Sequence, residues 1–75
     1  MDHLARRSVR LAGHATSIAL EPAFWVILEQ EAVRREIRLA ALIAEEDAKR
    51  AATEEPLASR LRVFALQVAA ARSVP

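Results

Sequence analysis

The hydrophobic pattern of the chain changes its period at Pro22. Before this proline, Val9 and Leu11 alternate with small or polar residues, and Ile18 and Leu20 do the same, which is the period-two pattern of a strand. After it, apolar residues recur at the three- and four-residue spacings of helices. The sequence therefore predicts a small α+β fold, mostly α, with one N-terminal strand followed by two to three helices.

Two of the predicted helices begin at a proline, which suits the first turn because its missing amide hydrogen would be unpaired there anyway. The apolar spacing that follows predicts helices over 22–35 and 56–71. Acid-before-base pairs four residues apart and an apolar side predict a further helix over 39–51. Residues 34–38 contain no glycine, proline, asparagine or serine, so the sequence leaves open whether the helices on either side of them are continuous.

A lone strand needs a partner, because its backbone donors and acceptors are otherwise unpaired. A chain of 75 residues with no cysteine and two histidines has neither a disulfide nor a four-ligand zinc set to supplement a small core, which leaves a partner subunit. We therefore expect the strand to pair with its own copy across an intertwined homodimer. The alternative is a two-residue turn at Gly13-His14 that pairs residues 8–12 with 15–19 inside one chain.

The single glycine, Gly13, excludes the glycine-rich phosphate loops and the GxSxG nucleophile elbow. The acidic cluster over residues 45–47 indicates a solvated helix face and not a catalytic pair. We expect no enzymatic activity and no cofactor or metal. Arg6, Arg7 and Arg10 interrupt any N-terminal signal core, and no apolar run is long enough to span a membrane, so we expect a cytoplasmic protein.

Residues 13–21, Gly-His-Ala-Thr-Ser-Ile-Ala-Leu-Glu, are followed by Phe24-Trp25. This combination resembles a short bacterial ribbon-helix-helix family with a GHxTSxxLE ribbon and an FW helix start, and the likeness extends over about residues 7–68. The resemblance implies a homodimer whose two-stranded antiparallel ribbon lies in the major groove of DNA. It also implies a domain over 8–71 between a basic arm, 1–7, and a tail, 72–75.

The alternation of the strand places Ala15, Ser17 and Ala19 on the face that the resemblance assigns to DNA bases, because Ile18 and Leu20 face the core. The family tends to carry an arginine at the position of Ala15 and a hydroxyl residue at that of Ala19. Alanine offers a base only methyl contact, so we expect weak sequence discrimination by this strand, with Ser17 as its polar reader.

The expected phosphate contacts supply affinity without sequence information. Between the first two helices, where the family usually has a glycine and then a serine or threonine, this chain has Glu36 and Arg38. The residues expected at phosphates are Arg6, Arg7, Arg10, His14 and Arg38. The residues expected in the dimer core are Ile18, Leu20, Trp25, Leu28, Leu42, Ile43, Leu61 and Phe64.

The sequence thus predicts a homodimeric DNA-binding protein that regulates transcription. The loss of polar readers at Ala15 and Ala19 motivates an alternative. In that alternative the chain is a dimerisation or adaptor module, for example antitoxin-like, that binds a protein partner with weak or no sequence-specific DNA binding.

Overall fold

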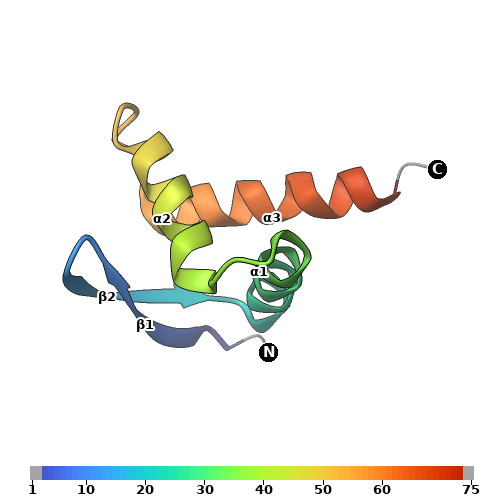
Figure 1. Ribbon diagram of the computed structural model, residues 1–75, viewed down its shortest axis with the longest axis horizontal. Helices are drawn as coiled ribbons and strands as arrows, with labels where there is room; N and C mark the ends of the chain where they lie inside the picture. Colours follow the sequence, from blue (N-terminus) through green and yellow to red (C-terminus); the bar gives the residue numbers. More distant parts are fainter. Residues whose placement is uncertain (1–2, 74–75) are drawn as a thin grey trace.

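The computed structural model describes residues 3–73 and contains a strand hairpin followed by three helices. In Figure 1, α2 and α3 lie over one face of the hairpin and α1 lies beside them. This arrangement confirms the α+β class. Strands β1 (Ala5–Leu11) and β2 (His14–Leu20) precede helices α1 (Pro22–Arg35), α2 (Leu39–Arg50) and α3 (Leu57–Ser73).

The strand partner differs from the prediction. β1 and β2 pair with each other in antiparallel register within the chain, so the expectation of a single strand that pairs only across two chains is wrong. The turn is Ala12-Gly13, one residue earlier than in the alternative considered from the sequence, and φ is positive at both residues, 50° and 84°. Such a turn matches the twist of two antiparallel strands. The backbone groups of the strand segment therefore find a partner without a second subunit.

The hydrophobic core lies between the inward face of the hairpin and the helices. Trp25 is 1% exposed, and its indole Nε1 donates a hydrogen bond of 2.7 Å to the carbonyl oxygen of Ala5 in β1. The residues predicted for a dimer core are all buried within the single chain. The buried core residues are Val9, Leu11, Ile18, Leu20, Trp25, Leu28, Ala32, Leu42, Ile43, Leu61, Phe64 and Ala65.

The chain turns between α1 and α2, which answers the question that residues 34–38 left open. Glu36 ends α1 in the left-handed conformation, with φ 57° and ψ 40°. The amides of Glu36 and Ile37 donate to the carbonyls of Val33 and Ala32, both at 3.0 Å. These bonds give partners to carbonyl groups that would otherwise be unpaired at the end of the helix. Arg38 then occupies the N-cap position of α2, where its side chain makes no capping hydrogen bond. Glu36 occupies the conformation that glycine normally takes at such a turn.

The ends of the domain also differ in position from those expected. β1 begins at Ala5, so residues 5–7 of the expected arm belong to the strand. α3 continues to Ser73, into the expected tail. Residues 3–4 precede the strand, and the remaining parts of those expectations, residues 1–2 and 74–75, lie outside the described residues.

Two further properties apply to residues 3–73. None of the three helices is both long and apolar enough to cross a membrane. Within the same range, no three His, Cys, Asp or Glu side chains gather in a way that could hold a metal ion.

The left-handed conformation of Glu36 makes a stability prediction. Glu36→Gly should raise the free energy of unfolding by about 0.5 to 1 kcal/mol. Glycine avoids the penalty of about 1–2 kcal/mol that a residue with a Cβ carries in the left-handed conformation, and this gain exceeds the cost of the greater flexibility of glycine in the unfolded chain. Chemical denaturation at fixed protein concentration measures this change. Glu36→Ala is the matched control, since it removes the same carboxylate but keeps the Cβ. An equal gain in both variants would contradict the backbone explanation.

Candidate nucleic-acid interface

One face of the hairpin points away from the helices. Strand alternation and the burial of the other face place three cross-strand pairs on this outer face. Ala15 and Ser17 are exposed there, and Ala19 is half-buried. The pairs that make up the outer face are Arg6–Ala19, Ser8–Ser17 and Arg10–Ala15.

Each alanine of the outer face stands opposite an arginine. Arg6 is the direct partner of Ala19, and Arg10 is the direct partner of Ala15. Directly opposed residues of an antiparallel pair have Cβ atoms about 5 Å apart, and a guanidinium reaches well beyond that distance. The outer face therefore carries positive charge towards both of its ends although β2 has no charged residue on this side.

Two serines lie at the centre of the outer face. Ser8 and Ser17 are direct cross-strand partners, and both are exposed. The Nη1 of Arg6 donates to the Oγ of Ser17 at 3.1 Å, which leaves the hydroxyl hydrogen of Ser17 available as a donor. Arg10 is held nearer the turn, where its Nη1 donates to the carbonyl oxygen of Gly13 at 3.1 Å. The face thus combines two fixed cations with two hydroxyl groups.

Arg7 lies on the opposite face of β1. Its guanidinium lies 4.7 Å from the centre of the Trp25 ring, and its Nη1 is 2.8 Å from Oε2 of Glu29. These contacts join β1 to α1. The structure therefore does not bring Arg7 together with Arg6 and Arg10, with which the sequence had grouped it.

The other two residues expected at phosphates lie at different places. His14 begins β2, is exposed and is paired in register with Leu11 beside the turn. Arg38 is exposed at the start of α2, and within residues 3–73 no hydrogen bond or ion pair joins its side chain to the hairpin. The hairpin thus places Arg6 and Arg10 on one face, whereas His14 lies on the opposite face at the turn end and Arg38 belongs to a separate element.

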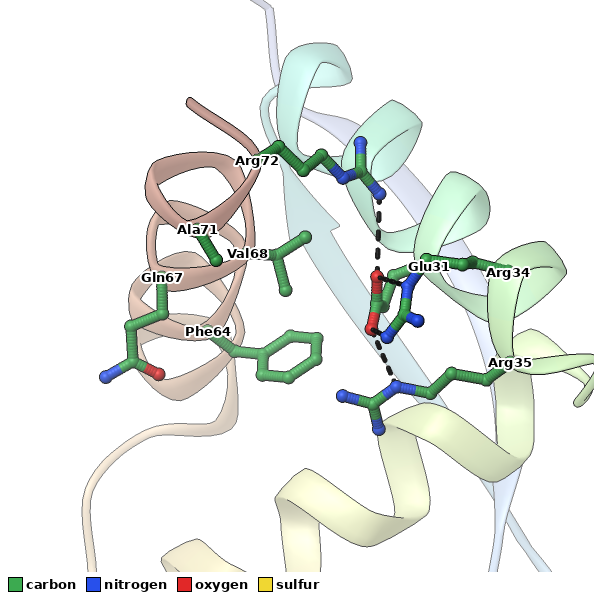
Figure 2. Close-up of a pocket in the computed structure, with 8 residues that line it drawn as sticks. All are labelled: Glu31, Arg34, Arg35, Phe64, Gln67, Val68, Ala71 and Arg72. Carbon is green, nitrogen blue, oxygen red and sulfur yellow. Dashed lines mark hydrogen bonds and ion pairs between the residues drawn. The ribbon is translucent and has the colours of Figure 1, made fainter. Parts of the chain in front are cut away.

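Two buried carboxylates were not anticipated. Glu46 is fully buried, with the Nζ of Lys49 at 2.9 Å and the Nε of Arg60 at 3.0 Å, so residues 45–47 are not simply a solvated face. Glu31 is 3% exposed and accepts hydrogen bonds from both Arg34 and Arg35 (Figure 2). Helical spacing pairs Glu31 with Arg35, but it carries no sign that the carboxylate is buried.

The environment of Glu31 changes its acidity. The hydrogen bonds from Arg34, and then those from Arg35, lower the pKa of Glu31 to about 2, against the opposing effect of burial. In the same way, the hydrogen bond from Arg62 lowers the pKa of Glu21. Both carboxylates therefore favour the folded state in their ionised form.

Comparison with known proteins adds to this geometry. Residues 4–69 match the family described as the ribbon-helix-helix domain. A solved structure of an uncharacterised protein from Bordetella pertussis Tohama I is similar, with a TM-score of 0.75 and 38% sequence identity. The similarity covers 96% of this chain and 62% of that chain, so this chain spans less than two thirds of the other protein's length. No curated protein matches the chain.

The two sides of β1 predict different roles in stability for neighbouring arginines. Arg7→Ala should lower the free energy of unfolding by about 1 kcal/mol, because it removes a cation–π contact and an ion pair. Arg6→Ala should change it by less than about 0.5 kcal/mol, as for an ordinary surface residue. Denaturation of the two variants under one set of conditions makes the comparison, and equal losses would contradict the assigned faces.

The lowered pKa of Glu31 predicts acid sensitivity. Because the folded state holds this proton less tightly than the unfolded state, the stabilisation is complete above about pH 4.5 and is lost as the pH falls towards 2. Glu31→Gln should therefore destabilise the protein at pH 7 and flatten the fall of its unfolding free energy with pH, by at most about 1.4 kcal/mol per pH unit for one proton. Denaturation at a series of pH values measures this slope. Some acid sensitivity should remain from Glu21. Identical slopes in the wild type and in Glu31→Gln would refute the lowered pKa of Glu31.

Proposed function

The chain belongs to the ribbon-helix-helix domain family, and on this premise we propose that it is a DNA-binding regulator whose hairpin enters the major groove of duplex DNA. The family is typical of DNA-binding regulators that have no enzymatic activity. The observation that carries the proposal is the outer face of the hairpin, in which arginines stand opposite Ala15 and Ala19. A two-stranded ribbon has dimensions that the major groove accepts.

The outer face can supply both phosphate contacts and base contacts. Arg6 and Arg10 can contact phosphates or the edge of a guanine, and a paired contact to guanine discriminates bases by about 1–3 kcal/mol. Ser8 and Ser17 stand between them with hydroxyl groups that both donate and accept. On this proposal β1 supplies the arginines that β2 lacks, so sequence reading does not depend on Ser17 alone.

His14 and Arg38 complete the proposed interface by contacting phosphates on either side of the ribbon. Such contacts position a protein on the duplex and make its affinity depend on salt. Arg38 stands at the N-cap position of α2 without a side-chain capping hydrogen bond, so its guanidinium can donate to a phosphate. The mechanism is occupancy of a DNA site, which regulates transcription without a chemical step.

We also propose that the regulator is a homodimer. β1 covers one edge of β2, and the sheet described within residues 3–73 contains these two strands alone, so the other edge of β2 has no strand partner there. Pairing of this edge with β2 of a second copy would align two hairpins in one sheet. The antiparallel ribbon between chains and the hairpin within each chain are therefore compatible.

DNA binding predicts a specific response to charge removal. Arg10→Ala should weaken binding to all duplex sequences and reduce the slope of log affinity against log salt by about 1 for each phosphate that the variant no longer binds. Fluorescence anisotropy of a labelled random-sequence duplex at several salt concentrations measures both. Arg50→Ala is the matched control, because Arg50 is the last residue of α2, whose end lies away from the hairpin (Figure 1).

Further outcomes separate the proposal from its alternative. Ser17→Ala should reduce discrimination between sequences, and a variant that binds every duplex as the wild type does would remove Ser17 from the base-facing surface. Sedimentation of the same samples counts subunits. A dimer that ignores DNA even at low salt would contradict DNA binding and favour the adaptor module, in which the alanines of β2 meet a protein partner.

A further inference from the structure

An open cavity of about 390 Å³ lies between the C-terminal halves of α1 and α3. This volume falls within the usual range of small-molecule sites. Figure 2 shows the two walls facing each other, with charged side chains from α1 and apolar side chains from α3. The cavity is separate from the outer face of the hairpin and has no part in the proposed DNA contacts.

The charged wall contains more cations than its carboxylates neutralise. Arg34, Arg35 and Arg72 all approach Glu31, with closest distances of 2.6, 2.7 and 3.6 Å. The other carboxylate in this group is Glu45, which is 3.5 Å from Arg35. Three guanidinium groups against two carboxylates leave one positive charge at the cavity wall.

Each arginine keeps a nitrogen for a ligand. Arg34 uses Nε and Nη2 on Glu31, so its Nη1 has no partner among the described residues. Arg35 uses Nε and Nη1, and Arg72 directs Nη1 to Gln30 and Nη2 towards Glu31. Within residues 3–73, Nη2 of Arg35 and Nε of Arg72 likewise have no hydrogen-bond partner. Glu31 also lines the cavity, but it is 3% exposed, whereas the side chains of Arg35 and Arg72 are 34% and 39% exposed, so a ligand meets these two arginines before the carboxylate.

The apolar wall is formed by Phe64, Val68 and Ala71 of α3. In Figure 2 the side chains of Phe64 and Val68 point across the cavity towards the arginines, whereas Gln67 points away from them. The guanidinium of Arg35 lies 5.5 Å from the centre of the Phe64 ring, so the charged and apolar walls meet there. An inorganic anion would leave this apolar surface in contact with water.

We propose that the cavity binds a small organic anion with an apolar body, of the aryl or alkyl carboxylate class. Its carboxylate accepts hydrogen bonds from Arg72, and its apolar body lies against Phe64 and Val68. Charge complementarity selects the anionic group, and the wall from α3 selects the apolar group. The site lies beyond the proposed DNA-binding function and does not depend on it.

The test uses phenylacetate as the probe, added to the full chain labelled for NMR. Saturable shifts are expected at the Nε–H signals of the cavity arginines and at backbone amides of 64–72, with a dissociation constant on the order of 1 mM for a ligand of this size. Acetate, which lacks the apolar body, and phenylethanol, which lacks the charge, should each bind about fivefold more weakly or worse. Equal binding of either compound would overturn the proposal, as would shifts that do not saturate or that scatter over the surface.

Two variants test whether phenylacetate binds in this cavity and separate this binding from DNA binding. Arg72→Gln should weaken phenylacetate binding about fivefold or more while leaving DNA affinity unchanged, and it suits the test because the Arg72 side chain is 39% exposed. Arg10→Gln is the matched control and should show the reverse pattern. Wild-type binding of phenylacetate by Arg72→Gln would refute the site even if DNA binding is confirmed, and failure of DNA binding would leave the phenylacetate result standing.

Discussion

The attachment of the hairpin to α1 through Trp25 is the interaction on which the rest of the structure depends. A two-stranded hairpin is marginally stable by itself, so it needs a helix to pack against. Trp25 is buried in the core, donates to the carbonyl of Ala5 and supports the guanidinium of Arg7. Because side chains of a strand alternate, this attachment also decides which residues face outwards. Arg6 and Arg10 belong to the outer face because Arg7 is held on the opposite face, against α1.

Ion pairs between elements supplement a core that a chain of this length keeps small. Arg60 of α3 meets the buried Glu46 of α2, and Arg62 of α3 binds Glu21 just before α1. Arg72 extends the same attachment to Glu31 near the other end of α3. The pairs of the buried carboxylates Glu46 and Glu31 add less to stability than to the choice of one arrangement, because desolvation offsets much of their attraction. They hold α3 in a defined position, and that position creates the cavity between α1 and α3.

Residues that carry charge therefore have distinct roles according to their partners. Arg6 and Arg10 make light contacts with Ser17 and Gly13 and keep their charge on the surface of the ribbon. Arg34 and Arg35 are held by a buried carboxylate at the wall of a cavity. The nearly neutral net charge of the chain hides this division, because the acidic side chains are concentrated on the helices and not on the hairpin.

Much of this protein was determined by its sequence. The change of period at Pro22, the helix starts and the bounds of α1 were predictable, because periodicity and proline act locally, and the family resemblance over most of the chain is confirmed. The strand that pairs with β2 was not predictable from the sequence, because Ala12-Gly13 is a weak turn signal compared with Asn-Gly. The packing of β1 under the helices is what favours the hairpin. The burial of Glu31 and Glu46 was also decided by tertiary structure. A carboxylate on a helix is exposed or buried according to what the opposite element presents, and those elements are distant in sequence.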